Sequence, residues 1–240
     1  MRHLFFLACT LAAAHRPANA SCMRLEIKPQ LLTLRDTRVP ADGGIVVGYG
    51  YTSNADELEQ TNSADPSDVA WTARDAKKQP VALTRTMLAP GLSVLRPAAA
   101  VAAFSLVNKQ GTQLGTFTHD GKPVAMAAPQ AKSVASETNV NPRWSATTAT
   151  LTLTAAAPPE AIAIIAYASG KPVNFTRLAD THDKDLELRI YSSGGHCGTE
   201  PPAGTSFFSA TGKLTFAYVD AFGRLSPQST PVTARQPKPR

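Results

Sequence analysis

Short motifs of catalysis are absent from this chain. No stretch matches G-x-S-x-G, H-E-x-x-H, a P-loop, the glycine pattern of dinucleotide-binding folds or C-x-x-C. Catalytic groups can also assemble from distant positions, so an enzyme is not excluded. The sequence nevertheless offers no positive sign of one, and it predicts a non-catalytic protein that needs no cofactor.

The chain also lacks a long hydrophobic run and a strong charge of one sign. No stretch reaches the ~18 uninterrupted apolar residues that a membrane span needs. Residues 1–20 contain two arginines and no acid, so the remainder has 22 basic and 18 acidic residues. These basic residues are scattered, whereas nucleic-acid-binding proteins usually carry a basic stripe with interleaved aromatics. We therefore expect no transmembrane anchor and no nucleic-acid partner.

The first twenty residues have the pattern of a secretory signal peptide. A short basic start precedes an apolar run over residues 4–14, and Ala18-Asn19-Ala20 fits an A-x-A cleavage site. We expect cleavage after Ala20 and a mature chain in the periplasm or outside the cell. A lipid anchor fits poorly, because Asn19 stands three residues before Cys22, where a lipoprotein signal has leucine.

Cysteine is scarce, with three residues in the chain. Cys9 leaves with the signal peptide, and Cys22 and Cys197 remain in an oxidising compartment. Two cysteines so far apart cannot form a zinc site by themselves. We predict a disulfide between them that links the start of the chain to a late loop, with pairing to a second chain as the alternative.

Alternating apolar residues indicate strands along the mature chain. The β-branched and aromatic stretch 43–51 predicts a central strand, and the proline-broken stretch 25–34 predicts an edge strand. Residues 52–68 are polar without an apolar period and predict a long surface loop. Residues 69–85 predict a hairpin in which Trp71 is the best candidate for the core aromatic residue.

Shorter strand-like stretches follow at 92–94, 101–107, 112–118, 132–135, 149–154, 161–168, 173–175 and 186–191. The composition of residues 161–168 would also suit a helix. Prolines and a glycine bracket this stretch at strand length, so a strand is favoured.

The C-terminal stretch 214–234, LTFAYVDAFGRLSPQSTPVTA, predicts a closing hairpin. Large apolar residues alternate from Leu214 to Tyr218, Asp220 and Gly223 supply turn chemistry, and a second alternation follows. This stretch resembles the last strand pair of a bacterial fibronectin type III or immunoglobulin-like module. The resemblance implies a β-sandwich fold and no particular function.

An earlier turn matches the turn of this hairpin. Asn108 and Gly111 correspond to Asp220 and Gly223 at a constant offset of 112 residues, and the apolar residues before them correspond as well. Any two sandwich hairpins obey similar rules, so the match supports two similar domains without proving a duplication.

We therefore expect an all-β protein of two tandem immunoglobulin-like (fibronectin III-like) β-sandwich domains after a signal peptide. Some 220 mature residues leave room for two such domains at roughly 100 residues each. The expected division is a signal peptide at 1–20, a first domain at 21–125, a second domain at 126–235 and a disordered tail at 236–240. The boundary lies in the stretch 119–130, which is rich in glycine, proline and alanine.

Two loops carry the clustered polar chemistry. Residues 180–185 hold three aspartates and His182, which could ligate a divalent cation, although a hydrophilic turn explains them as well. His196 beside Cys197 could be a soft-metal site, although a disulfide in a glycine-rich loop is the simpler interpretation.

The predicted function is that of an exported non-catalytic module that binds an unknown protein or cell-surface partner, or has a structural role. Its polar loops 52–68 and 192–206 are the expected partner surfaces. One alternative is a periplasmic assembly chaperone, because two immunoglobulin-like domains and a basic balance resemble the pilus-chaperone family. Another is a metal-dependent hydrolase that uses His182, Asp183 and His196.

Overall fold

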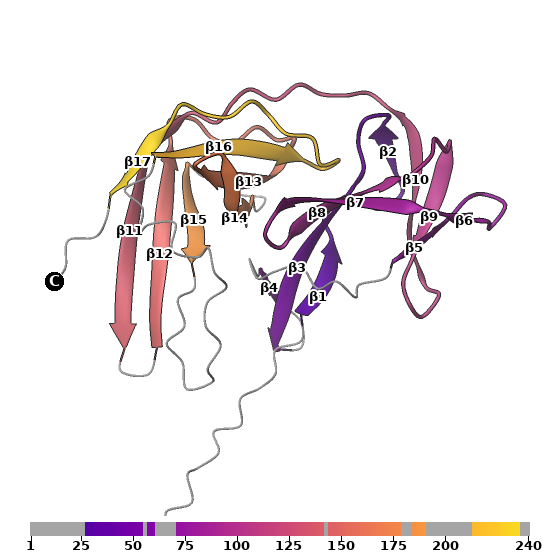
Figure 1. Ribbon diagram of the computed structural model, residues 1–240, viewed down its shortest axis with the longest axis horizontal. Helices are drawn as coiled ribbons and strands as arrows, with labels where there is room; N and C mark the ends of the chain where they lie inside the picture. Colours follow the sequence, from indigo (N-terminus) through magenta and orange to yellow (C-terminus); the bar gives the residue numbers. More distant parts are fainter. Residues whose placement is uncertain are drawn as a thin grey trace, which may run out of the picture.

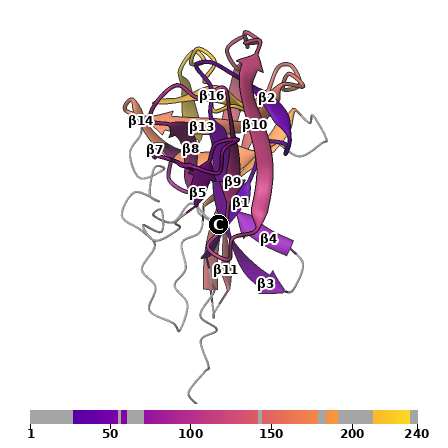
Figure 2. The same ribbon diagram turned by 90° about the vertical axis from the view of Figure 1, so that its right-hand side faces the viewer.

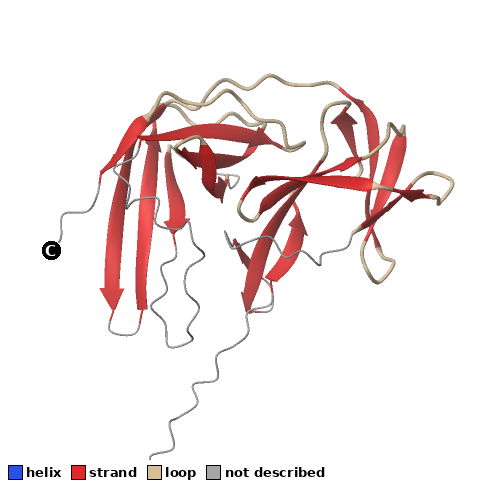
Figure 3. Ribbon diagram, viewed as in Figure 1, coloured by secondary structure: helices blue, strands red, loops and turns tan. Residues whose placement is uncertain are grey.

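The computed structural model describes residues 27–54, 57–60, 71–141, 144–178, 184–190 and 213–235. Every regular element in these ranges is a strand, so the expected all-β class is confirmed (Figure 3). The described residues contain no helix long and apolar enough to cross a membrane.

Seventeen strands are described. They are β1 (Ile27–Leu31), β2 (Thr37–Pro40), β3 (Ile45–Asn54), β4 (Glu57–Gln60), β5 (Thr72–Arg74), β6 (Pro80–Val81), β7 (Leu83–Ala89), β8 (Leu92–Pro97), β9 (Ala103–Val107), β10 (Gln113–Gly121), β11 (Ala131–Asn141), β12 (Trp144–Leu153), β13 (Ala161–Ala168), β14 (Lys171–Arg177), β15 (Asp185–Ile190), β16 (Lys213–Asp220) and β17 (Val232–Arg235).

The N-terminal half, residues 27–121, is built from two sheets packed face to face. The first has the order β1-β3-β8-β7 with β4 beside β3, and the second has the order β2-β10-β9-β5-β6. Figure 2 shows β2 beside β10, which pairs with it in parallel. The core between the sheets consists of buried residues from both, namely Val39, Ile45, Ala73, Phe104, Leu106 and Phe117.

The structure corrects three expectations for this half. Residues 52–68 are not all loop, because β3 extends to Asn54 and β4 pairs back onto it. A strand of polar residues can form through its backbone hydrogen bonds alone. Its sequence then shows no alternation of apolar residues from which the strand could be predicted. The predicted hairpin 69–85 is limited to β5 and β6, since β7 pairs with β8 in the other sheet. Trp71 is only partly buried at the edge of a core whose fully buried aromatics are Phe104 and Phe117.

The C-terminal half, residues 131–235, is one seven-stranded sheet of order β14-β13-β16-β17-β11-β12-β15. It curls around its own core, whose largest members include Leu151, Ile164 and Phe216. The Thr176 hydroxyl donates to the Glu187 carbonyl over 2.9 Å and joins β14 to β15 at the two ends of the sheet. Residues 161–168 form a strand, as predicted, and not a helix.

The return strand of the C-terminal hairpin is shorter than predicted. Only β17 is regular, and it pairs with β16 at two positions. Ahead of it, the hydroxyl of Ser226 accepts from the Tyr218 N–H, and the hydroxyl of Ser229 accepts from the Phe216 N–H. Side-chain oxygens therefore take part in the pairing in a stretch where Pro227 and Pro231 have no N–H to offer.

The two turns that correspond in sequence have the same geometry. In each, the carbonyl of the first residue, Asn108 or Asp220, accepts from the glycine N–H, and its side-chain oxygen accepts from the N–H four residues on. Gly111 and Gly223 both have a positive φ, of 81° and 73°. The residues that match at a constant offset in the sequence therefore form two turns of the same geometry, each with glycine at the left-handed position.

A third buried cluster joins the two halves. It combines Val46, Ala89 and Leu92 of the N-terminal half with buried residues of β13, β14 and β16. Strand β13 is buried on both faces, since Ile164 packs in the C-terminal core and Ile165 packs in the junction. The halves are linked by the strand-free stretch 122–130, which runs along the top of Figure 1. They therefore share a continuous apolar interface.

Two buried tyrosines make the fold sensitive to alkaline pH. Burial raises the pKa of Tyr167, in the junction, and of Tyr218, in the C-terminal core. The unfolded chain releases both protons near pH 10, whereas the folded chain retains them. The free energy of unfolding should therefore fall as the pH rises past about 10.

Urea midpoints measured at about pH 8 and about pH 11 will test this expectation. Replacing both tyrosines by phenylalanine should make the decrease smaller. An equal decrease in the double variant would assign the sensitivity to other groups.

Candidate functional site

The residues singled out from the sequence as a disulfide or metal site lie outside the described residues; they are Cys22, His182, Asp183, His196 and Cys197. The disulfide and the metal-dependent hydrolase therefore stay predictions. Most of the two loops expected to bind a partner is also outside the described ranges. Asp185 is described, and it is an exposed residue at the start of β15. Within the described ranges, no three His, Cys, Asp or Glu residues are grouped so that they could hold a metal ion.

The described site with the most specific geometry is the junction of the two halves. Strand β16 runs toward the N-terminal half, and the turn that follows it ends against that half (Figure 1). The Gly44 N–H donates to the Phe222 carbonyl over 2.8 Å. The Thr33 hydroxyl donates to the Ala221 carbonyl over 2.6 Å and accepts from the Val46 N–H over 2.8 Å. The turn of the last hairpin is thus hydrogen-bonded to the connecting segments before β2 and before β3 of the N-terminal half.

Close packing accompanies these hydrogen bonds. A Cβ atom on Gly223 would lie 2.6 Å from a methyl carbon of Val94, and one on Gly43 would lie 3.0 Å from the Cβ of Phe222. At Gly111, in the matching turn, no described atom lies within 4 Å of the corresponding position. The same turn is therefore open in the N-terminal half and packed against a neighbour in the C-terminal half.

A buried carboxylate holds the packed turn together. Asp220 is 3% exposed. One of its oxygens accepts from the backbone N–H groups of Phe222 and Arg224, each over 2.9 Å. The other accepts from two guanidinium nitrogens of Arg224, at 2.8 and 2.6 Å. Arg224 also donates to the Val124 carbonyl over 3.0 Å, which ties the 122–130 connection to the turn.

A cavity of about 470 Å³ lies beside this turn, with walls from both halves and from the connection. Its apolar lining includes Leu34, Val124 and Ile162. Leu34 is 75% exposed and Val124 is 48% exposed, which makes them two of the four large exposed hydrophobic side chains in the described ranges. The cavity therefore offers an unusually apolar rim to solvent.

Four charged residues line this cavity: Arg177, Asp220 and Arg224 bind other groups of the protein, and Glu160 is exposed. Asp220 and Arg224 bind each other, and Arg177 donates to the side-chain oxygen of Gln30 over 2.6 Å. Desolvation lowers the pKa of the Arg177 guanidinium. Internal pairing leaves the aliphatic side chains as the main surface for a ligand.

No protein-family model matches this chain, and no curated protein matches its sequence. The resemblance to fibronectin type III and immunoglobulin-like modules therefore rests on residues 214–234 alone. The sequence predicts Asp220 and Gly223 as turn residues but does not indicate that this turn lies in the junction. An Asp-x-x-Gly pattern predicts a tight turn, and it carries no information about what the turn touches.

Proposed function

We propose that the protein is an exported, non-catalytic binding module whose two immunoglobulin-like (fibronectin III-like) sandwiches are fixed to each other, and that it binds an apolar segment of a partner protein in the junction cavity. The observation that carries the proposal is the pair of exposed aliphatic side chains, Leu34 and Val124, at the rim of a cavity between the two halves. Ligand sites occur preferentially at such interfaces.

The chemistry of the walls supports a protein segment over a small charged ligand. Clustered exposed hydrophobic side chains mark protein–protein contact sites. The charges of Asp220 and Arg224 neutralise each other, and the other two charged lining residues, Glu160 and Arg177, have opposite signs, so the cavity provides little net attraction for an ion. Binding should therefore depend on apolar contact and vary little with salt. The sequence matches none of the short catalytic motifs considered above, and this supports the non-catalytic part of the proposal.

A cross-linking experiment in the exporting cell tests this function. A photoreactive amino acid placed at Leu34 should cross-link to a partner protein, whereas the same group at Met87 should not. Met87 is a matched control, because it is 58% exposed and does not line the cavity. Equal labelling from both positions, or no adduct from Leu34, would contradict the proposal.

Charge substitution provides the quantitative test. Leu34→Asp and Val124→Asp should each weaken partner binding at least about tenfold, the effect of losing a central apolar contact. Met87→Asp should leave the affinity unchanged. Sedimentation of the purified chain shows whether the bound partner is a second copy. The partner-protein proposal fails if all three variants bind like the native chain.

A further inference from the structure

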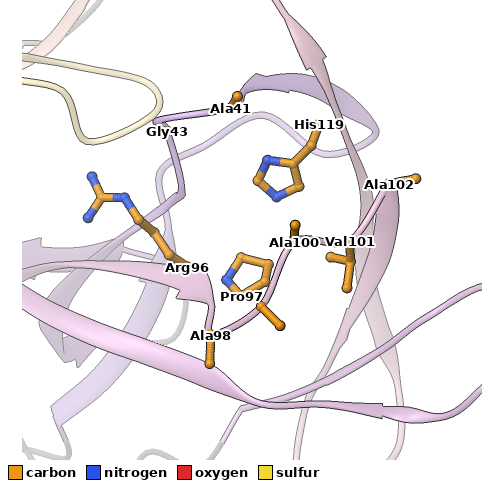
Figure 4. Close-up of a pocket in the computed structure, with 10 residues that line it drawn as sticks. Ala41, Gly43, Arg96, Pro97, Ala98, Ala100, Val101, Ala102 and His119 are labelled. Atoms are coloured by element: carbon orange, nitrogen blue, oxygen red, sulfur yellow. The ribbon is translucent and has the colours of Figure 1, made fainter.

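A second cavity, of about 540 Å³, lies within the N-terminal half. It is located where the chain crosses from β8 to β9, and its walls are the turn before β3, the alanine-rich residues 96–102 and His119 of β10 (Figure 4). This volume is in the range of small-molecule sites in proteins. The cavity shares no lining residue with the junction cavity, so it is a separate candidate site.

A row of three aromatic rings leads from the core of the N-terminal half to this cavity. Phe117 and Phe104 are fully buried, and their ring centroids lie 5.5 Å apart. The imidazole of His119 stacks on Phe104 with a centroid distance of 5.7 Å and an interplanar angle of 26°. The backbone N–H of His119 donates to the Ala102 carbonyl over 2.9 Å, which fixes the strand that carries the ring. The imidazole is therefore the outermost ring of the row and the one that lines the cavity.

One face of the imidazole is covered by Phe104, and the opposite face has no aromatic neighbour among the described residues. Figure 4 shows the ring face-on between Ala41 and Ala100, with none of the other lining side chains drawn over it. Apart from Arg96, the residues around it are alanine, glycine, proline and valine. The imidazole therefore presents a flat surface to a cavity whose walls are small and apolar.

The surroundings of the two ring nitrogens place the proton of the imidazole. Nε2 is buried and has no hydrogen-bond partner among the described residues. In Figure 4 one nitrogen is turned toward Ala100 and Pro97 and the other toward Ala41 and Gly43. Buried N–H groups without an acceptor are rarer than buried acceptors without a donor, so we place the single proton of the neutral ring on Nδ1. The flat surface is then that of an uncharged ring.

The guanidinium of Arg96 takes no part in this surface. Figure 4 shows it turned away from the His119 ring and from the alanine segment. Its Nε donates to the Asp42 carbonyl over 3.3 Å, which holds it in that direction. No carboxylate is among the lining residues. The space in front of the imidazole is therefore bounded by uncharged groups.

We infer that this cavity binds a small, flat, uncharged aromatic molecule. Its ring would stack on the free face of His119 and extend the row that begins at Phe117, because offset stacking is a preferred arrangement of aromatic rings. The small side chains of the walls leave room for a ring beside the imidazole. A charged ligand would be desolvated there without compensation. The site goes beyond the proposed binding of a partner protein and does not depend on it.

Titrations of the full chain with three probes test the ligand class. Benzyl alcohol should shift the imidazole proton resonances of His119 upfield in a saturable way, because a stacked ring shields them. Cyclohexylmethanol has a similar size and the same hydroxyl but a puckered, more hydrophobic body, and it should bind at least about threefold more weakly. Benzoate, which is flat but charged, should bind at least about tenfold more weakly. Equal or tighter binding of cyclohexylmethanol or benzoate, or no upfield shift with benzyl alcohol, would overturn the inference.

Two variants locate the site, with binding followed by saturation transfer to the probe. His119→Leu replaces the flat surface by a branched one, so the preference for benzyl alcohol over cyclohexylmethanol should disappear. Ala100→Phe should abolish binding of both probes, because its ring would fill the space in front of the imidazole. Ala100 is exposed, so this variant should fold even if His119→Leu does not. A preference that survives in His119→Leu, or native affinity in Ala100→Phe, would contradict the assignment.

Two further variants serve as controls. Ala76→Phe adds the same ring at an exposed position in the turn between β5 and β6, which does not line the cavity, and it should bind like the native chain. Arg96→Met removes the cation but keeps an unbranched side chain, and it should also keep the native affinity for benzyl alcohol. A loss in Ala76→Phe equal to that in Ala100→Phe would place binding elsewhere. A tenfold loss in Arg96→Met would show that the site depends on charge and would overturn the inference.

Discussion

Replacing Asp220 by alanine should lower the free energy of unfolding by about 3–5 kcal/mol, the usual effect of removing one partner of a buried ion pair. The substitution leaves the guanidinium of Arg224, which is 14% exposed, without its carboxylate. It also removes the acceptor for the backbone N–H groups of Phe222 and Arg224. The turn that docks on the N-terminal half would then lose its internal support, so we expect the junction to loosen together with the turn.

The matching turn provides the control for this prediction. Asn108 accepts from a single exposed backbone N–H and has no ion pair, so Asn108→Ala should lower stability by only about 1 kcal/mol. Asp220→Asn should fall between the two, because it can keep an acceptor for the backbone but loses the charge. Chemical denaturation of the three variants measures these differences. Equal losses at positions 108 and 220 would show that the buried pair has no special role.

The second large effect is expected at Gly223. Alanine at this position must adopt a positive φ, which destabilises by about 1–2 kcal/mol. Its methyl group would also lie 2.6 Å from a Val94 methyl carbon, and overpacking of this kind adds about 1–3 kcal/mol. Gly223→Ala should therefore lower the free energy of unfolding by about 2–5 kcal/mol.

Gly111→Ala separates the two contributions. Gly111 has nearly the same φ but an open Cβ position, so only the backbone term of about 1–2 kcal/mol should remain. In a Val94→Ala background, the effect of Gly223→Ala should become smaller, because part of the obstructing side chain is gone. Equal effects at the two glycines, in either background, would contradict close packing at the junction.

The strands were largely predictable because their apolar residues alternate or form short bracketed runs. Strand β3 was expected to be central from its β-branched and aromatic residues, and it pairs with strands on both sides. The paired turns at Asn108 and Asp220 were predictable from side-chain and glycine chemistry that acts within four residues. Strand β4 was missed, because a polar strand is defined by its backbone hydrogen bonds.

The candidate sites were much harder to predict. The junction combines a turn near the C-terminus with Thr33, whose hydroxyl lies 188 positions away in the chain from the carbonyl that it contacts. Contacts of this kind depend on how sheets pack, and alternation along one strand does not report on that packing.

The all-β class, most strand positions and the geometry of the two equivalent turns can be predicted from the sequence, because these depend on backbone preferences and on residues that are neighbours in the chain. The packing of the two halves, in contrast, leaves one of the turns open and places the other against Val94. The same packing places Ile164 and Ile165 in two different cores. Burial depends on the surface that a segment meets, and here much of that surface is supplied by residues far away in the chain, such as Val94 for Gly223 and Leu92 for Ile165.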